Sequence, residues 1–195
     1  MEKETRTFNF EIREDQEKRK MIGHAAVFGE VADIGGWFNE QVDPGAFKAS
    51  IRKDDVRALF NHDENYVLGR NKAKTLRLSE DDTGLKVTID PPDTQFARDL
   101  QVSIDRGDIS QMSFAFQVQE EEWVRGDKGK PDLRKIKKVR LFDVSPVTFP
   151  AYTGTDIAVR SHKAWRKEID TPPAFELVEE QYESLDFRRK LIGRI

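Results

Sequence analysis

A chain of 195 residues is long enough for one domain with a hydrophobic core and an appended segment. Its 33 basic and 36 acidic residues give a formal net charge of -3, so the chain lacks the excess positive charge that favours nucleic-acid binding. The lack of cysteine excludes disulfides, thiolate metal ligands and a cysteine nucleophile. The charged N-terminus and the lack of an apolar run of about 18 residues argue against secretion and membrane insertion, so we expect a soluble, cytoplasmic protein.

Alternating apolar and polar residues predict short strands through the first two thirds of the chain. The first pattern covers residues 8–12. Two further patterns, 76–78 and 85–89, flank a turn-rich segment that predicts an antiparallel hairpin with a loop longer than two residues. Residues 112–119 and 136–144 also look extended, and the Gly- and Asp-containing segment between them predicts a second hairpin. This order favours a mainly β domain.

Two helices are predicted among these strands. The clearer one begins after Asp93, a plausible N-cap, and apolar residues recur at helical spacing through 96–104. A shorter helix is expected to start at Pro44, whose fixed backbone angle suits a first helical position, and to carry Phe47 and Ile51 on one side.

The composition changes after Arg160, where the sequence becomes rich in Lys and Glu. Pro172-Pro173 interrupts this segment, and an amphipathic stretch follows at 177–185. We therefore predict a domain at 1–160 and a detachable charged tail at 161–195.

Ser113 is a candidate nucleophile, because acyl transfer by serine needs an accessible hydroxyl with a base in hydrogen-bonding reach. In the extended segment 112–118, alternation sends the methionine and both phenylalanines to one face, and Ser113 with Ala115 to the other. We expect Ser113 to leave the apolar layer where a substrate backbone can approach. A strand serine on a polar face is most often only solvated, so both interpretations stay open. Ser110 is a fallback nucleophile, but it precedes the strand.

His62 is the best placed of three histidines, the others being His24 and His162. It follows the apolar segment 56–61 and precedes a polar loop that begins at Asp63. A strand end can hold an imidazole rigidly while leaving it accessible, and histidine is the usual general base near neutral pH. A surface histidine, or one paired locally with Asp63, is the alternative interpretation.

Asp143 is the only charged residue in the apolar segment 141–149. A carboxylate is costly to bury unless it is paired and hydrogen-bonded, and a histidine N–H would supply such a partner. This is the orienting role of the acid in a triad. A structural acid before Pro146, or one facing water at a strand end, is the competing interpretation.

Metal and cofactor sites are not expected. Three scattered histidines without cysteine lack any ligand spacing, and Gly35-Gly36 lacks the strand-to-helix pattern of a phosphate loop. Arg70 and Arg140 are the nearest candidates in sequence for a charged helper of the serine chemistry.

Five segments occur in the order found in tailed-phage prohead proteases, and over roughly residues 5–160 the chain resembles this family, which is related to the herpesvirus protease assemblin. The segments are Gly23–Phe28, Phe47 before the first helix, Leu59–Asp63 with Leu68-Gly69, Asp108–Phe116 and Phe142–Ala151. The resemblance implies a closed antiparallel β-barrel with flanking helices, like the herpesvirus protease, or more loosely an α+β fold.

The resemblance also implies roles for single residues. The family's base maps onto His62, its nucleophile onto Ser113, and the acid before the Val-Ser-Pro segment onto Asp143. Assemblin uses a second histidine as its third member, so His24 stays an alternative to the acid. Ala115 departs from the family pattern, because many relatives have glycine two residues after the serine, and a positive backbone angle there would disfavour alanine.

The function implied by the resemblance is that of a serine endopeptidase in procapsid maturation. Its expected substrates are the scaffold, or the scaffolding segment of the major capsid protein, and the protease itself, with cleavage releasing the tail from Ser161. We expect a homodimer located in the cytoplasm of the infected bacterial host, inside the assembling procapsid. A catalytically silent capsid-assembly module of the same fold is the main alternative, and an unrelated β-barrel binding protein is a third.

Overall fold

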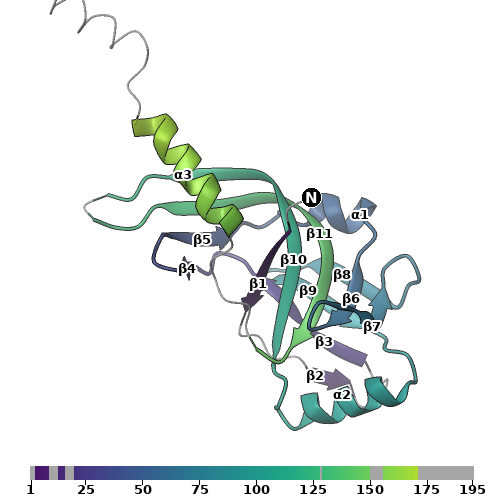
Figure 1. Ribbon diagram of the computed structural model, residues 1–195. Coiled ribbons are helices and arrows are strands. Elements are labelled where there is room, and N and C mark those ends of the chain that lie inside the picture. Colours follow the sequence, from purple (N-terminus) through teal and green to yellow (C-terminus); the bar gives the residue numbers. More distant parts are fainter. Residues whose placement is uncertain (1–2, 9–12, 16–19, 128, 150–155, 171–195) are drawn as a thin grey trace, which may run out of the picture. The chain divides into compact units, whose positions relative to one another are not determined.

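Strands dominate the computed structural model, which describes residues 3–8, 13–15, 20–127, 129–149 and 156–170 (Figure 1). The strands are β1 Glu4–Phe8, β2 Arg13–Asp15, β3 Lys20–Val27, β4 Ala32–Ile34, β5 Phe38–Val42, β6 Arg57–Phe60, β7 Asp63–Arg70, β8 Leu76–Glu80, β9 Gly84–Ile89, β10 Gln111–Val124 and β11 Leu133–Val147. The helices of these ranges are α1 Lys48–Lys53, α2 Gln95–Asp105 and α3 Asp156–Asp170. The expectation of a mainly β fold is confirmed.

The strands form two sheets. One has the order β1-β10-β11-β5-β4, with β6 also paired to β11 and β7 paired to β6, and the other has the order β2-β3-β9-β8. Along the edge away from β10, β11 pairs in parallel with β5 at Leu133–Ile136 and with β6 at Asp143–Val144. The sheet therefore branches at β11. The expected closed barrel is not confirmed, since no closed barrel is found among the described residues. The expectation of a purely antiparallel arrangement is wrong, because β11 pairs in parallel with β5 and β6.

The predicted hairpins are both present. β8 pairs antiparallel with β9, and β10 pairs antiparallel with β11 in the long hairpin that runs through Figure 1. Alternation along β10 places Met112, Phe114 and Phe116 in the core, where all three are fully buried. Phe114 stacks on Phe116 with ring centroids 4.7 Å apart and meets Phe47 edge-on at 5.4 Å. Burying each such side chain stabilises the fold by about 2–3 kcal/mol, so the apolar face of β10 fixes the orientation of this strand against the core.

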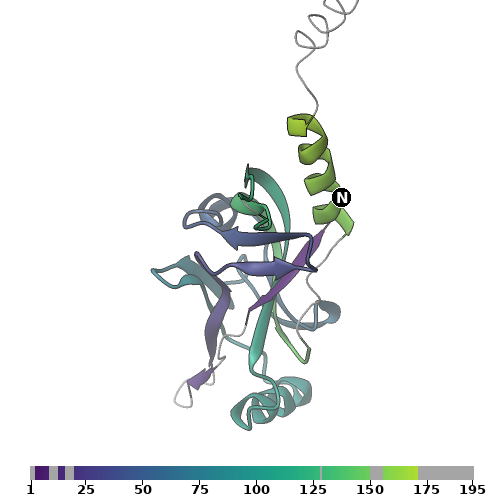
Figure 2. The same cartoon turned by 90° about the vertical axis from the view of Figure 1, so that its left-hand side faces the viewer.

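The predicted helices exist with shifted starts. α2 lies at one end of the domain in both views (Figures 1 and 2), and its N-cap is Thr94 rather than Asp93, since the Thr94 hydroxyl accepts from the Ala97 amide at 3.3 Å. α1 begins at Lys48 rather than Pro44. The preceding amides of Gly45 and Phe47 donate instead to the Glu80 carboxylate, at 3.1 and 2.8 Å, which holds this segment in turns.

The C-terminal part of the chain forms a separate unit. The two units are Met1–Ala158 and Val159–Ile195, and α3 begins in the first and continues into the second. The amphipathic stretch predicted at 177–185 lies outside the described residues, as do residues 9–12 of the first predicted strand. The division into a domain at 1–160 and a removable tail stays a prediction. No helix within the described ranges is long and apolar enough to cross a membrane.

A buried cluster of charged side chains fixes β1 in the larger sheet. Arg6 bonds the Glu40 carboxylate of β5 at 2.5 and 2.9 Å and the Glu4 carboxylate at 2.8 Å. Arg134 of β11 contacts the same two acids at 2.9–3.2 Å and also reaches Glu121 of β10 at 2.6 Å. Burial opposes the charge of Arg134, but hydrogen bonding and attraction to these carboxylates raise its pKa above the usual value.

Candidate active site

A two-residue turn presents His62. β6 ends at Phe60, β7 begins at Asp63, and these two residues pair across the hairpin. Asn61 and His62 between them have positive φ angles of 52° and 59°, as a type I′ turn requires at both central positions. The polar loop expected after His62 is therefore part of strand β7 instead. The tight turn fixes the backbone of His62, whose side chain keeps 19% of its surface exposed.

Asn61 attaches this turn to the end of β11. Its backbone amide donates to the Pro146 carbonyl at 3.0 Å, directly after the end of β6. Its side-chain amide donates to Thr148 Oγ1 at 3.1 Å, and its side-chain oxygen accepts from the Thr148 amide at 2.9 Å. Asn is also among the residues that tolerate a left-handed backbone best. The side chain of Asn61 thus suits the left-handed backbone of the turn and attaches the turn to the end of β11.

Ser113 lies beside this histidine but is not exposed. It follows Met112 in β10 and turns away from the apolar core side chains, as alternation predicted. Its side chain is nevertheless 0% exposed, so the expectation of an accessible hydroxyl is wrong for this conformation. β1 pairs along β10 with Thr7 opposite Ser113, and the Arg6 carbonyl accepts from Ser113 Oγ at 2.7 Å. Strand alternation gives the face of a residue but not what covers that face.

Asp143 completes a hydrogen-bonded series with the other two predicted residues. Ser113 Oγ lies 2.8 Å from His62 Nε2, and His62 Nδ1 lies 2.5 Å from Asp143 Oδ1. An ionised carboxylate only accepts hydrogen bonds, so Nδ1 carries a hydrogen and donates to Asp143. In the neutral imidazole this leaves the lone pair on Nε2 facing the Ser113 hydroxyl. The three candidates are therefore brought together in the order that serine chemistry requires.

Two further side chains hold the Asp143 carboxylate. Ser145, two residues along β11 and opposite Ser113 in the register, donates to Oδ1 at 2.9 Å. Lys3 donates to Oδ2 at 2.7 Å. Burial opposes ionisation of Asp143, whose side chain is 3% exposed, but hydrogen bonds and positive charge from His62 and Lys3 lower its pKa below 3.8. The carboxylate therefore stays ionised and oriented at neutral pH.

The hydroxyl of Ser113 has two acceptors within reach but only one hydrogen. It can donate to His62 Nε2 or to the Arg6 carbonyl, which lie at 2.8 and 2.7 Å. When the imidazole is protonated, Nε2 donates to Oγ and the hydroxyl donates to Arg6. When the imidazole is neutral, the Arg6 carbonyl competes with it for the hydrogen.

The remaining candidates lie apart from this site. His24 is in the smaller sheet, where its Nε2 bonds both carboxylate oxygens of Asp81 at 2.9 Å, and the position beside His62 Nδ1 is taken by Asp143. Ser110 is exposed just before β10. Arg70 bonds Asp55 at 2.5 and 2.8 Å.

Ala115 has an ordinary backbone for a strand residue. It is not among the non-glycine residues with positive φ, so the conformation found for it does not call for glycine. Ala115 pairs with Asp143, and the register between β10 and β11 shifts directly after this pair, which leaves Phe142 as an extra residue on β11. The shift lies next to the carboxylate, where bulges commonly re-aim side chains.

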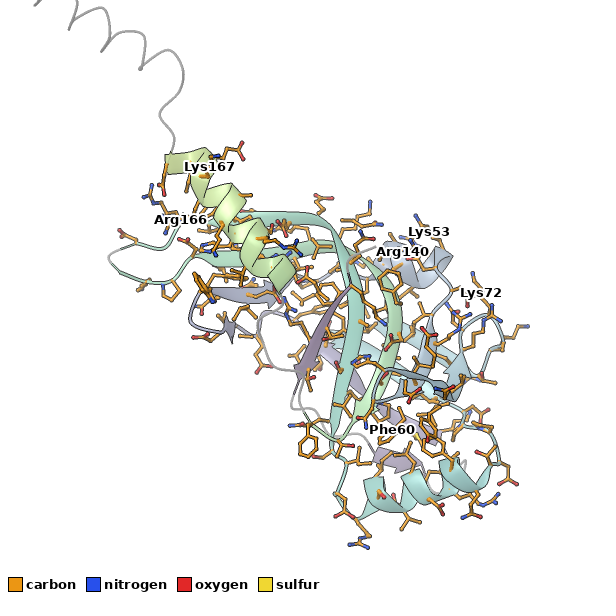
Figure 3. The ribbon with its side chains drawn as sticks, in the orientation of Figure 1. Lys53, Phe60, Lys72, Arg140, Arg166 and Lys167 are labelled. Carbon is orange, nitrogen blue, oxygen red and sulfur yellow. The ribbon has the colours of Figure 1, made fainter. Side chains whose placement is uncertain are left out.

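A cavity of about 670 Å³ borders the carboxylate end of the site. Its lining comes from β6, β7, β11, the segment before β6, and Lys3, and it includes Asp143 but not Ser113. Arg140 of β11 also lines the cavity, and its guanidinium lies over the Phe142 ring, 5.1 Å from the ring centroid. Figure 3 shows Arg140 near α1 and Phe60 of β6 toward the other end of β6 and β11. Within the described residues, no group of three or more His, Asp or Glu side chains is arranged to hold a metal.

A family model described as caudovirus prohead serine protease matches residues 7–168. The chain belongs to this family. No match was found among curated proteins or among solved structures. The matched region contains Ser113, His62 and Asp143, so the hydrogen-bonded series lies inside the part of the chain that matches the prohead protease family.

Sequence reasoning missed several contacts of this site. Ser145 carried an available signal, because a residue two positions from Asp143 on a strand shares its face. Asn61 carried another, since Asn is favoured in two-residue turns. Lys3 and Arg6 carried none, because the charged N-terminal segment looks like an ordinary solvated one.

Proposed function

We propose that this prohead protease family member is an active serine endopeptidase with Ser113 as nucleophile, His62 as general base and Asp143 as the orienting acid. The observation that carries the proposal is the unbroken hydrogen-bonded series from Ser113 Oγ through the imidazole to a buried, ionised carboxylate. Removing the proton from a serine hydroxyl needs such a base, and the imidazolium that forms needs such an acid.

The reaction follows from the positions of these atoms. His62 Nε2 takes the hydroxyl proton as Ser113 Oγ bonds to the carbonyl carbon of a substrate peptide. The imidazolium, held by Asp143, then gives this proton to the leaving amine as the peptide C–N bond breaks, and the acyl-enzyme ester remains. Water gives a proton to the same imidazole and bonds to the ester carbon. The imidazolium returns this proton to Ser113 Oγ as the ester bond breaks, which releases the acid product and restores Ser113.

The site must open before it can act on a peptide. Ser113 is completely covered, and the Arg6 carbonyl engages its hydroxyl. A substrate carbonyl can reach Oγ only after a covering group moves. We propose that assembly provides this movement, through a homodimer formed inside the procapsid, so that the isolated chain is held nearly silent.

The proposed substrates are the scaffold, or the scaffolding segment of the major capsid protein, and the protease itself. The family description, which names the prohead, supports work inside an assembling capsid in the infected bacterial cytoplasm. The charged segment 161–195 follows the domain and is proposed to be released by self-cleavage near Ser161.

A catalytically silent capsid-assembly module is the second candidate. The full burial of Ser113 and its bond to the Arg6 carbonyl favour this alternative, because both oppose attack on a substrate.

Labelling with a serine-directed phosphonate distinguishes the two functions. At concentrations that favour dimers, the wild-type chain and a Ser110→Ala control should gain one phosphonate, found on the peptide that contains Ser113. The Ser113→Ala and His62→Gln variants should remain unlabelled. A wild-type dimer that stays unmodified, or labelling that survives His62→Gln, would exclude the proposed protease.

Self-cleavage needs a separate experiment. The wild-type protein and Ser113→Ala are incubated at high concentration, and their intact masses are compared over time. Loss of a C-terminal fragment from the wild type alone supports tail release, whereas identical intact masses in both samples remove it from the proposal.

A further inference from the structure

We infer that Lys3 is a positioning residue of the site: its cation balances the charge of Asp143 and thereby keeps His62 neutral, and able to accept the Ser113 proton, at lower pH. This inference rests on the proposed protease function. Lys3 also lies before the region 7–168 that matches the family model, so it adds a feature to the site from outside that region.

The carboxylate of Asp143 divides its two oxygens between two kinds of partner. Oδ1 receives His62 Nδ1 at 2.5 Å and Ser145 Oγ at 2.9 Å, and Oδ2 receives Lys3 Nζ at 2.7 Å. Lys3 therefore binds the carboxylate oxygen that the imidazole does not bind. A cation there reduces the net negative potential that Asp143 exerts on His62, which is the potential that would stabilise an imidazolium.

Several other charged groups line the cavity. Besides Lys3 and Asp143, its charged lining residues are Asp54 and Asp55 before β6, Arg57 of β6, Glu64 of β7 and Arg140 of β11. Arg57 bonds Asp55 at 3.4 Å, and Arg140 stacks over Phe142. Lys3 is the cation of this lining that the structure places in an ion pair with Asp143.

The fold keeps Lys3 at this position. Its neighbour Glu4 belongs to the buried charged cluster with Arg6, Glu40 and Arg134, and β1 pairs with β10 from Glu4 to Phe8. The side chain of Lys3 is 39% exposed, whereas that of Asp143 is 3% exposed. The ammonium thus stays in contact with water and salt while it neutralises a carboxylate that is not.

This placement predicts a shift in pH dependence instead of a uniform loss of activity. In Lys3→Met, Asp143 acts on His62 without a balancing cation, the imidazolium is stabilised, and a higher pH is needed to free the base. The pH at which labelling of Ser113 reaches half its maximum should rise by roughly half a unit or more, given a partly screened charge at this range. The maximal rate at high pH should change little.

The test measures the rate of phosphonate labelling from pH 5 to 9 for four full-length proteins. They are the wild type, Lys3→Met, Lys3→Arg, which restores a cation, and Lys48→Met, which removes an exposed lysine of α1. Lys3→Arg and Lys48→Met should follow the wild-type profile, and added salt should shrink the shift seen in Lys3→Met. A Lys3→Met profile that coincides with the wild type, or one lowered equally at every pH, overturns the inference.

A second measurement separates this inference from the proposed function. The ring protons of His62 are titrated by NMR in the wild type and in Lys3→Met, with His62→Gln used to assign the signal. A higher titration midpoint in Lys3→Met supports the role of Lys3 even if no protein is labelled, in which case only the protease proposal fails. Equal midpoints overturn the inference whatever the labelling shows.

Discussion

The turn that carries His62 should depend on the side chain of Asn61 in a measurable way. Asn61→Gly keeps a residue that adopts positive φ without strain but removes both side-chain bonds to Thr148, at 3.1 and 2.9 Å. Both bonds are exposed, so each contributes at the low end of the usual range, and the free energy of unfolding should fall by about 1 kcal/mol. Phosphonate labelling of Ser113 should slow by about 5- to 10-fold, because His62 is held less firmly.

Asn61→Ala separates backbone strain from the lost hydrogen bonds. Alanine removes the same two bonds and adds roughly 1–2 kcal/mol for a left-handed backbone, so its unfolding free energy should fall by about 2–3 kcal/mol. Thr148→Ala removes one acceptor but leaves the backbone bond from residue 148, and it should show about half the effect of the glycine variant. Urea unfolding and the labelling rate are measured on all three. If Asn61→Gly matches the wild type in both assays, the backbone alone positions the turn and our reasoning is refuted.

Two further predictions concern the carboxylate of Asp143. Ser145→Ala should slow labelling by roughly 3- to 30-fold, because a buried hydrogen bond to a charged group is lost, while Ser110→Ala leaves the rate unchanged; equal rates in the two variants would count against a role for Ser145. The pKa of Asp143 is lowered in the folded state, so this carboxyl group binds a proton more readily in the unfolded chain. The stability that the ionised Asp143 carboxylate contributes is therefore lost as pH falls below about 3.8. The stability difference between the wild type and Asp143→Asn should therefore narrow from pH 5 to pH 3 in urea unfolding, and a constant difference would contradict the shift.

Local patterns predicted the parts of the fold that depend on near neighbours. Period-two alternation along β10 correctly assigned Phe114 and Phe116 to the core, since both faces of a strand are fixed by its own backbone. The turn-rich segments likewise marked both hairpins. The branching of the sheet at β11 was not predictable in this way, because parallel pairing with β5 and β6 joins strands that are far apart in the sequence.

The candidate site likewise has parts that local sequence predicted and parts that it did not. Ser113, His62 and Asp143 each had a local setting suited to its proposed role, but their convergence was implied by an ordered resemblance to a family and by no pattern within the chain. The contacts of the N-terminal segment had no such support. Lys3 and Asp143 are 140 positions apart, and the Arg6 carbonyl is 107 positions from Ser113, so only the assembled fold brings them together.

The buried charged cluster gains a physical rationale from these long-range contacts. Burying Glu4, Arg6, Glu40 and Arg134 is expensive, and apolar residues of similar size would often stabilise a sheet as well. The ion pairs instead specify the register of β1 against β10. A slip of β1 by one residue would turn Arg6 to the opposite face and leave the buried Glu40 carboxylate with one arginine instead of two. Since that register also sets Lys3 against Asp143 and the Arg6 carbonyl against the Ser113 hydroxyl, the cluster fixes the contacts through which the N-terminal segment governs both ends of the site.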